Sequence, residues 1–566
     1  MKKGSINNMK TRWYKNAVVY QIYPFSFMDS NNDGWGDING IISKLDYIKD
    51  LGATAIWFSP LYDSPDYDYG YDVKDYKAID KKFGTMADFD NLLNECHKRD
   101  LKVIMDMVIN HTSTEHIWFK KALEGDEKYR NYYIIRKGRK IKNKLLPPTN
   151  WVSSFTGPAW ERIDNTDEYY LHLFAKEQAD LNWENEEVRD EIVDILNFWL
   201  NKGVDGFRFD VFNLFSKVHP LKDDDSRNVQ TGSPFFIDGP RIHEFLNEIN
   251  TRALSLYDSY TVGESYLPSK KDCLKYVDEV NNELDTIFNF AHLNADNIGG
   301  LKFFKKAFNL KQFKRGFFTP QNTYYGVGWN TLVLENHDVP RSVSRFGIDY
   351  KKYHYEAATF LATITFMGFG IPFIYMGEEI GMTNTNFNNI DELQDPVSHF
   401  VYNLMRSFHM PASLAFKFIK YGARDHARTP IQWDDGINAS FNDGHSPWQR
   451  INDNYKDINV KKDLSSNKSI YHYYQKLLKI KKENEVIIYG KTKEYNHNNN
   501  KVIAYSRDYN DSKVFVFGNF SNKKVTYEVP DEFKDYDILI SNYSDTNKSN
   551  TYELRPYEAI VLSPNK

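Results

Sequence analysis

The sequence contains only two cysteines, Cys96 and Cys273, in 566 residues. So few thiols argue against a fold held together by disulfide bonds, and Cys96 falls on the apolar face of an expected helix, where we expect a reduced core thiol. No stretch reaches 18 apolar residues, which argues against a transmembrane helix. Residues 1–10 are polar and lack the apolar segment of a signal peptide. We therefore expect a cytoplasmic protein with no membrane partner.

The sequence also lacks an excess of charge of either sign. Its 72 Lys and Arg nearly balance its 77 Asp and Glu, and no long basic run is present, so we expect no nucleic-acid partner. Aromatic residues, in contrast, reach 16%. Aromatic faces suit sugar rings, although most of these side chains are expected in the core. A chain of this length exceeds one hydrophobic core, so we expect two or three domains in a monomer without an organic cofactor.

The stretch 203–211 organises the chain. Gly203 ends a helix, and residues 206–210 read as a short buried strand with a carboxylate at its C-terminal end. Alternation along a strand places Arg208 and Asp210 on one side. A nearby guanidinium favours the ionised carboxylate and lowers its pKa, as a carboxylate nucleophile requires. The alternative is a buried ion pair that only stabilises the core.

Strands and helices alternate along most of the chain, which indicates a parallel α/β fold. Polar residues follow the C-terminal ends of the strands, where a (β/α)₈ TIM barrel places its active site. The expected strands are 17–25, 54–59, 102–109, 206–210, 260–263, 283–288, 331–334 and 371–375.

Two insertions and a tail complete the predicted architecture. Residues 1–110 and 180–486 form the catalytic barrel, and 111–179 form an inserted domain (domain B) after the third strand. A second, irregular insertion covers 381–463. Residues 487–566 alternate in short β segments, which predicts a C-terminal antiparallel β-sandwich domain; the segments expected there are 502–505, 514–517, 525–529, 538–540 and 559–562.

A loop after the first strand is rich in oxygen-bearing side chains. These are Asp29, Asn31, Asp33 and Asp37, with glycines that permit tight turns. Alternating oxygens of this kind wrap a hard cation in EF-hand loops, which favours a structural Ca²⁺ site. An Asx-rich turn without an ion is the alternative.

Three carboxylates lie at the ends of three different strands: Asp210, Glu264 and Asp338. Retaining glycoside hydrolysis needs an ionised carboxylate nucleophile and a protonated acid across the bond. Asp210 suits the ionised role, and Glu264, near two other acids, suits the protonated one. A Zn²⁺ site is the chemical alternative because His111 and His337 are nearby, but the histidines do not have the i, i+4 spacing of a helical zinc motif.

At these residues the chain resembles the α-amylase superfamily of glycoside hydrolases (glycoside hydrolase family 13). The stretches 106–111, 206–210, 263–264 and 336–338 resemble its four signature regions in order, and 178–182 resembles the signature of its oligo-1,6-glucosidase branch. The resemblance covers nearly the whole chain. It implies the (β/α)₈ barrel, domain B and the C-terminal β-sandwich.

The resemblance also implies roles for individual residues. Asp210 is the implied nucleophile, Glu264 the acid/base and Asp338 the stabiliser of the transition state. Asp68 and Tyr71 resemble the pair that closes the glucose pocket of exo-acting enzymes. Further implied pocket residues are His111, Phe174, Gln178, Arg208, His337 and Arg424. The implied calcium ligands are Asp29, Asn31, Asp33, the Trp35 carbonyl and Asp37.

The linkage preference depends on few residues. Val211, after the implied nucleophile, resembles members that prefer short α-1,6-linked glucosides, the oligo-1,6-glucosidases. Residues 178–180 and 238–245 resemble trehalose-6-phosphate hydrolases instead, but these usually carry Lys after a His-Leu pair, where this chain has Asn294. Lys302, Lys305 and Lys306 are possible substitutes, although a solvated helix face is the simpler interpretation.

Two related classes fit less well. Sucrose isomerases resemble this chain, but their charged Arg-Leu-Asp-Arg-Asp loop is absent. Non-catalytic relatives, such as transporter heavy chains or a carbohydrate-binding homologue, have lost catalytic acids or carry a membrane helix. We therefore predict an α-glucosidase that acts on small oligosaccharides or disaccharides, with trehalose 6-phosphate as the alternative substrate.

Overall fold

The computed structural model describes residues 12–142, 144–226, 230–266 and 270–564. The polar segment 1–10, on which the expected absence of a signal peptide depends, lies outside these residues. Cys96 is buried and Cys273 is half-buried, and both are free thiols. In the described part of the chain, every helix is too short or too polar to cross a lipid bilayer.

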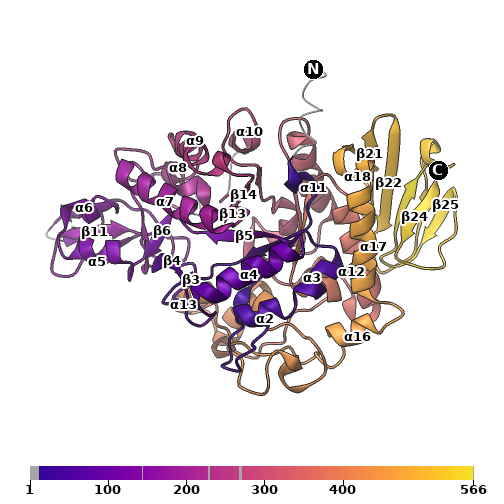
Figure 1. Ribbon diagram of the computed structural model, residues 1–566, viewed down its shortest axis with the longest axis horizontal. Coiled ribbons are helices and arrows are strands. Elements are labelled where there is room, and N and C mark those ends of the chain that lie inside the picture. The colour runs from indigo at the N-terminus through magenta and orange to yellow at the C-terminus, as the bar shows by residue number, and fades with distance from the viewer. Residues whose placement is uncertain (1–11, 143, 227–229, 267–269, 565–566) are drawn as a thin grey trace.

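Eight parallel strands form the central barrel, as predicted (Figure 1). Their spatial order is β15-β14-β13-β5-β2-β1-β19-β18. The seam between β15 and β18 is bridged by a side chain, because Thr331 Oγ1 donates to the carbonyl of Ile287 at 3.2 Å. The strands are β1 (Val19–Ile22), β2 (Ala55–Phe58), β5 (Lys102–Met107), β13 (Gly206–Phe209), β14 (Tyr260–Gly263), β15 (Thr286–Ile287), β18 (Thr331–Val333) and β19 (Ile371–Tyr375).

The inside of the barrel is filled by large side chains. The Trp57 and Phe288 rings lie 5.4 Å apart, and Phe288 lies 4.9 Å from Phe373, so three strands meet through aromatic contacts. The sixth strand was expected over 283–288, but only two of those residues form ladder pairs. The preceding residues Glu283 and Asp285 instead bind groups outside the ladder, including His243 and the backbone of Thr261.

Helices surround the barrel, and local sequence signals fix their ends. Thr85 and Asp88 form a capping box at the start of α4. Gly203 adopts φ 103° and ends α7, a conformation that favours glycine. The helices are α3 (Leu45–Leu51), α4 (Met86–Lys98), α7 (Glu186–Lys202), α9 (Ile242–Arg252), α10 (Lys270–Val277), α11 (Leu310–Tyr324), α12 (Tyr350–Phe366) and α17 (Ile470–Glu483).

Domain B projects from one side of the barrel (Figure 1). Its two ends meet because β6 (His111–Ser113) pairs antiparallel with β12 (Gln178–Asp180), which places His111 opposite Asp180. The insertion contains two short helices and a three-stranded sheet; these are α5 (Ile117–Leu123), α6 (Glu127–Arg130), β10 (Trp160–Arg162), β11 (Glu168–Leu171) and β7 (Ile135–Lys137).

The second insertion is more regular than expected. It contains a pair of helices, α13 (Pro396–Ser407) and α14 (Ala412–Gly422), which pack on each other. Proline at the first position of α13 is compatible with a helix start, because that residue needs no amide donor. The expectation of an irregular segment was therefore wrong for these residues.

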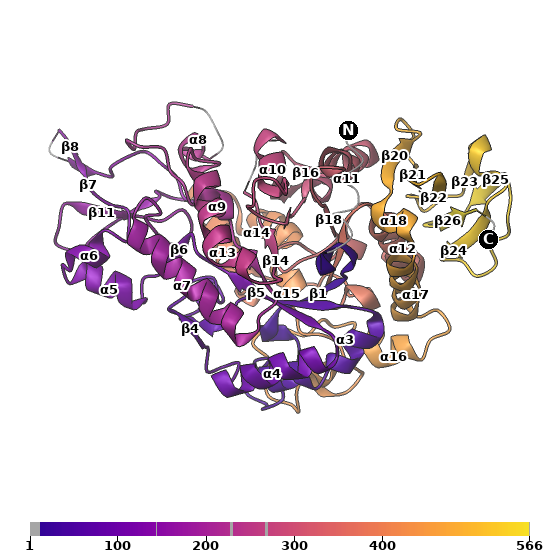
Figure 2. The same cartoon turned by 45° about the horizontal axis from the view of Figure 1, so that its top comes forward.

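The C-terminal part is an antiparallel β domain at the other end of the molecule (Figure 2). It has its own hydrophobic core and also packs on α12. Two of its strands, β20 and β25, were not expected from the sequence. The strands are β20 (Lys491–Tyr495), β21 (Val502–Tyr509), β22 (Ser512–Asn519), β23 (Val525–Glu528), β24 (Asp537–Ser541), β25 (Thr551–Leu554) and β26 (Ala559–Ser563).

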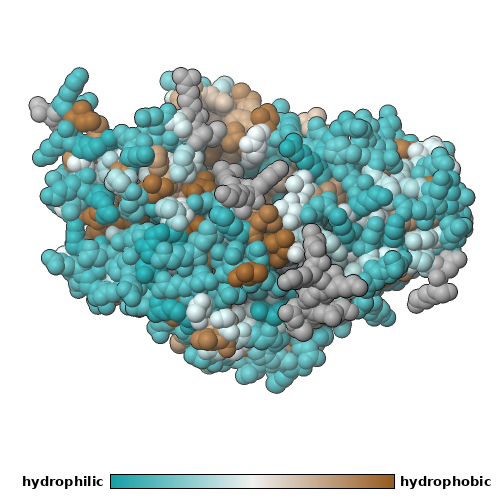
Figure 3. Space-filling view, turned by 90° about the horizontal axis from the view of Figure 1, so that it is seen from above, coloured by the Kyte–Doolittle hydropathy of each residue, from teal (hydrophilic) through white to brown (hydrophobic). Residues whose placement is uncertain are grey.

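The face of the molecule seen in Figure 3 is mostly hydrophilic, and its visible apolar residues form separate small groups.

Candidate active site

The three predicted acids meet at the C-terminal end of the barrel. Asp210 follows β13, Glu264 follows β14, and Asp338 lies five residues after β18. Asp210 is 7% exposed, and the side chain of Asp338 is 29% exposed. Parallel strands end at one rim of a barrel, which is why residues so far apart in the sequence come together.

Arg208 connects two of the acids. Its Nη1 donates to Asp210 Oδ1 at 2.7 Å, and its Nη2 donates to Glu264 Oε2. The same Nη1 also donates to Asp106 Oδ1 at 2.7 Å. One buried guanidinium thus holds three carboxyl groups in a single cluster.

Burial, rather than Arg208, decides the pKa of Asp210. Removal from water raises this pKa to about 6, and the opposing effect of Arg208 is smaller. The sequence analysis predicted a lowered pKa from the guanidinium alone and was wrong in direction. The group is still mostly ionised at neutral pH.

Glu264 has the higher pKa of the pair, at about 8. Burial is the main cause, Arg208 opposes it, and the nearby charges of Asp210 and Asp338 raise the pKa further. The predicted retention of a proton on Glu264 therefore agrees in direction with the structure. At neutral pH, one carboxyl of the pair carries a proton and the other carries a charge, which is the division that acid–nucleophile catalysis requires.

Asp338 is held in its ionised form by two arginines. Its Oδ1 accepts from Arg424 Nη1 at 3.2 Å and from Arg428 Nη2 at 3.0 Å. The pKa of Asp338 lies well below its usual value despite burial, because the charges of Arg424 and Arg428 stabilise the carboxylate. A fixed negative charge at this place can stabilise positive charge that develops on a sugar ring.

Tyr71 and His337 form one wall of the pocket. Their rings stack with centroids 5.4 Å apart, and Tyr71 Oη lies 2.7 Å from His337 Nε2. Burial lowers the pKa of His337 to about 3, so its ring is neutral. Gln21 Nε2 donates to His337 Nδ1 at 2.8 Å, so the proton of the neutral His337 ring is on Nε2. The Tyr71 hydroxyl accepts from this Nε2 and donates to Asp106 at 3.1 Å. The chain of hydrogen bonds fixes both rings.

Asp68 lies across the pocket in a second cluster. Its Oδ1 accepts from Arg424 Nη2 at 3.0 Å, and Arg424 Nε donates to Asp395 at 2.8 Å. Gln178 Nε2 reaches Asp68 at 3.4 Å and the carbonyl of Tyr71 at 3.1 Å. A segment after β2, domain B and the second insertion are thereby tied together at one point.

His111 and Phe174 belong to the same region. His111 Nε2 lies 3.0 Å from the carbonyl of Tyr71 and 3.2 Å from Gln178 Nε2, and its ring lies 5.3 Å from that of Phe174. The pairing of β6 with β12 brings these residues to the barrel. His111, Phe174 and Gln178 are thus connected to Tyr71 and Asp68 by these contacts.

Val211 has an unusual backbone. Its φ is 36° and its ψ is 39°, a left-handed conformation that is strained for a β-branched residue. Its side chain is buried in a cluster that includes Leu214 and is in contact with Phe174. The strained turn follows Asp210 directly.

The loop predicted to bind calcium has oxygens of the right type, but they bind the loop itself. Asp29 accepts from the amides of Asn32 and Gly34, and Asp37 accepts from those of Ser30 and Gly40. The Asn31 and Asp33 side chains accept from the amides two residues ahead, Asp33 and Trp35. No group of three or more His, Cys, Asp or Glu side chains in the described residues is arranged to hold a metal ion. Calcium binding by Asp29, Asn31, Asp33, Trp35 and Asp37 stays a prediction.

Four residues of the site were missed in the sequence analysis: Gln21, Asp106, Asp395 and Arg428. Asp106 carried a signal, because a lone carboxylate within an apolar strand needs a partner. Gln21 lies on a strand in the same way. Asp395 and Arg428 come from the second insertion, and their local sequence contains nothing that places them at the barrel.

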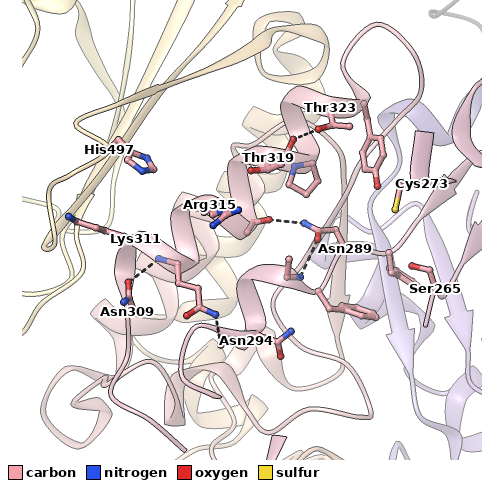
Figure 4. Close-up of a pocket in the computed structure, with 17 residues that line it drawn as sticks. Ser265, Cys273, Asn289, Asn294, Asn309, Lys311, Arg315, Thr319, Thr323 and His497 are labelled. Carbon is pink, nitrogen blue, oxygen red and sulfur yellow. Dashed lines mark hydrogen bonds between the residues drawn. The ribbon is translucent and has the colours of Figure 1, made fainter. Parts of the chain in front are cut away.

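The larger of two cavities near the barrel is not the one that contains the acids. A hollow of about 110 Å³ is lined by Glu264 and Asp338. A much larger one, about 940 Å³, extends along α11 and is lined by Lys311, Arg315 and His497 among others (Figure 4). None of the three acids lines the larger cavity, so we place the chemistry at the smaller one.

The chain is similar to known proteins over nearly its whole length. Residues 21–490 match the model of the alpha amylase catalytic domain, and 502–561 match that of the alpha-amylase SusG C-terminal domain. The chain is 45% identical to an oligo-1,6-glucosidase of Parageobacillus thermoglucosidasius over 98% of this chain and 99% of that protein.

Two solved structures are similar over the full length. The trehalose-6-phosphate hydrolase of Bacillus licheniformis is 44% identical, with a TM-score of 0.92 over 98% of this chain and 100% of that one. The isomaltulose synthase of Protaminobacter rubrum is 38% identical, with a TM-score of 0.94 over the same shares.

Proposed function

The chain belongs to the α-amylase family of glycoside hydrolases, and we propose that it is an exo-acting, retaining α-glucosidase that cleaves short α-1,6-linked glucosides. The observation that carries this proposal is the cluster of Asp210 and Glu264 on one guanidinium, in which burial keeps a proton on Glu264.

The proposed reaction has two steps. Glu264 donates its proton to the glycosidic oxygen while Asp210 attacks the anomeric carbon, which forms a covalent glycosyl-enzyme. Glu264, now ionised, then takes a proton from water as the water attacks the same carbon and releases Asp210. Asp338, held ionised by Arg424 and Arg428, stabilises the positive charge on the ring in both transition states.

Retention is supported by the closeness of the two carboxyl groups. Inverting enzymes separate them by about 6.5–9.5 Å to admit a water molecule, and retaining enzymes bring them to about 5–5.5 Å. Here one guanidinium binds both groups: Arg208 Nη1 donates to Asp210 and Arg208 Nη2 donates to Glu264. A shared guanidinium keeps the two carboxyl groups close together, which favours the retaining arrangement.

Exo action is supported by the closed end of the pocket. The ion pair between Asp68 and Arg424 and the stacked rings of Tyr71 and His337 stand where a sugar chain would otherwise continue. A substrate can therefore place only its terminal glucose beyond the scissile bond.

The α-1,6 preference is supported by Val211 and by similarity to oligo-1,6-glucosidases. Trehalose 6-phosphate is the competing substrate, since a hydrolase of that compound is nearly as similar. Asn294, at the position where those enzymes usually carry Lys, argues against it.

The test follows the anomeric product by proton NMR during hydrolysis of isomaltose. Retention predicts that α-glucose appears first from the non-reducing unit and mutarotates later. Initial release of β-glucose would contradict the assignment of Asp210 as a nucleophile.

A further inference from the structure

Two segments that pack on each other contain no acidic residue. Residues 297–334 contain six lysines and arginines and residues 396–424 contain four, but neither segment has an Asp or a Glu. The whole chain, in contrast, has a net charge of −5. The segments lie side by side because the hairpin of β16 (Asn297–Ile298) and β17 (Leu301–Lys305) packs on α14. Positive charge is therefore concentrated in one part of an acidic molecule.

We call the part formed by α13, α14 and the β16–β17 hairpin the helix–hairpin surface. Its exposed cations are Lys305, Arg406 and Lys417. Lys305 lies over the ring of Tyr421 at 5.0 Å, and Arg406 donates to the carbonyl of Met410. In the described residues none of these three cations forms an ion pair with a carboxylate, and the Lys417 side chain has no partner. Their charges are therefore available to a partner.

The helix–hairpin surface also exposes large apolar side chains. Phe400, Leu404 and Phe408 recur at intervals of four residues, which places them on one side of α13 and its C-terminal end, and Phe408 is 76% exposed. Six of the 16 large apolar residues that are exposed in the described chain belong to this surface: Ile298, Leu301, Phe400, Leu404, Phe408 and Leu414. None of the six belongs to a hydrophobic core within the described residues. Exposed apolar residues gathered on one part of a protein indicate an interaction site.

The elements that carry these side chains have a core of their own. Met405 of α13 and Ile419 of α14 are buried in a cluster with Phe303 of β17. A Cβ at Gly422 would lie 2.4 Å from the carbonyl of Lys302, so glycine at this position permits α14 to approach β17. Since the buried residues hold the elements together, the exposed apolar side chains can be changed without opening the core.

The combination of exposed apolar side chains and unpaired cations matches an anionic lipid bilayer. Apolar side chains enter the boundary between headgroups and acyl chains, and Lys and Arg are attracted to anionic headgroups. A second copy of the chain matches less well. A two-fold contact would place the helix–hairpin surface against itself, positive charge against positive charge, with no acidic residue from these elements to pair with it.

We propose that the helix–hairpin surface docks the protein on anionic lipid bilayers, with Leu404 and Phe408 inserted among the lipids and the neighbouring cations at the headgroups. The sequence analysis expected no membrane partner because no segment spans a bilayer, but a surface contact needs no such segment. The surface adjoins the active site, since the Phe400 ring lies 6.2 Å from that of Phe155, which lies 5.7 Å from Phe174 of the pocket. Docking would therefore keep the substrate pocket near the membrane.

The test measures sedimentation of the purified full-length protein with lipid vesicles, and it does not depend on the proposed glucosidase activity. Vesicles of phosphatidylcholine mixed with phosphatidylglycerol carry negative charge, and vesicles of phosphatidylcholine alone are the neutral comparison. The proposal predicts binding to the anionic vesicles and little binding to the neutral ones. Binding should weaken as the salt concentration rises, because salt screens charges at a surface.

A first pair of variants tests the apolar contact. Leu404→Ser combined with Phe408→Ser removes the inserted side chains, and it is expected to lower the partition coefficient on anionic vesicles by at least about 10-fold. Leu256→Ser combined with Val280→Ser is the matched control, because both residues are exposed and lie outside the helix–hairpin surface. The control should bind like the wild type. Thermal unfolding checks that both variants are folded.

A second pair tests the charges. Lys305→Gln combined with Lys417→Gln removes two exposed cations, which predicts a roughly 10- to 30-fold loss of binding to anionic vesicles. Lys476→Gln combined with Lys479→Gln, at two exposed positions of α17, changes the net charge equally. This control should keep most of the binding, which separates the position of the charges from their number.

The outcomes that overturn the proposal are distinct. Absence of binding to anionic vesicles at low salt overturns it without any variant, and so does equal binding to neutral vesicles. Binding that is unchanged in both surface variants would place the lipid contact elsewhere. A dimer found by light scattering in the wild type and lost in both surface variants would assign the surface to a second copy and overturn the lipid assignment.

Discussion

Arg208 Nη1 donates to Asp210 Oδ1 at 2.7 Å from two residues earlier on the same strand. Side chains alternate between the two faces of a strand, so Arg208 and Asp210 point to the inside of the barrel and Phe207 and Phe209 point to the outside. The guanidinium therefore keeps the Asp210 carboxylate oriented even though burial raises its pKa to about 6. The pair combines a fixed direction with a charge that is present at neutral pH.

The first prediction concerns Asp210 and Glu264. Asp210→Asn removes the nucleophile and Glu264→Gln removes the proton donor, while both keep the shape of the side chain. Each is expected to lower kcat on isomaltose by at least about 100-fold. Circular dichroism and thermal unfolding check that the fold remains. Turnover near that of the wild type in either variant would remove the corresponding role.

The second prediction is a bell-shaped pH profile. Activity needs Asp210 ionised, so it falls as the pH drops below about 6, and it needs Glu264 protonated, so it falls as the pH rises above about 8. Because the two groups are coupled, the limbs report the pair. The profile of kcat/KM is measured with the wild type. In Glu264→Gln, assayed on dinitrophenyl α-glucoside, the acid limb should persist and the alkaline limb should vanish. An unchanged alkaline limb would assign it to another group.

The third prediction concerns metal binding by the 29–37 loop. If Ca²⁺ binds the native state there, it stabilises the fold, by about 2.7 kcal/mol at a concentration 100 times its Kd. EDTA should then lower the melting temperature, and excess Ca²⁺ should restore it. The exposed ligands allow a control, because Asn31→Ala with Asp33→Ala should no longer respond to EDTA. Equal responses of variant and wild type would place the ion elsewhere, and the absence of any response would favour the self-bonded turn.

The fourth prediction concerns linkage. Val211→Thr keeps the β-branched shape at a strained turn and adds a hydroxyl at the edge of the second subsite. Changes of this size in an apolar pocket shift selectivity by about 1–3 kcal/mol, or roughly 10–200-fold. The ratio of kcat/KM for maltose to that for isomaltose should rise. Since both substrates are measured on one preparation, a loss of folded protein cancels in the ratio. An unchanged ratio would show that Val211 does not determine the linkage preference.

Much of the fold could be predicted because each buried parallel strand is a short apolar run that can be recognised from the neighbouring residues. Strands such as β14 and β19 are short apolar runs, and their polar residues start where the strand ends, so Glu264 could be placed at the rim from its neighbours alone. Asp210 was found by the same signal. The capping pair Thr85 and Asp88 shows that helix starts are equally local.

The rest depends on contacts between distant segments. Asp395 and Arg428 reach the pocket from the second insertion, and nothing near them in the sequence indicates this. The pKa of Asp210 could not be predicted from Arg208, since burial in the assembled barrel has the larger effect. Lys302 was assigned to a solvated helix face, but it lies on β17 beside the acids, a position set by contacts with distant segments.

The central claim is the preference for an α-1,6-linked, neutral disaccharide. Its most direct test is a measurement of kcat/KM for isomaltose, maltose, trehalose and trehalose 6-phosphate under one set of conditions. The account predicts the highest value for isomaltose, with two glucose molecules formed from each isomaltose that is cleaved. A value for trehalose 6-phosphate far above that for isomaltose would contradict it and would make the chain a phosphotrehalase.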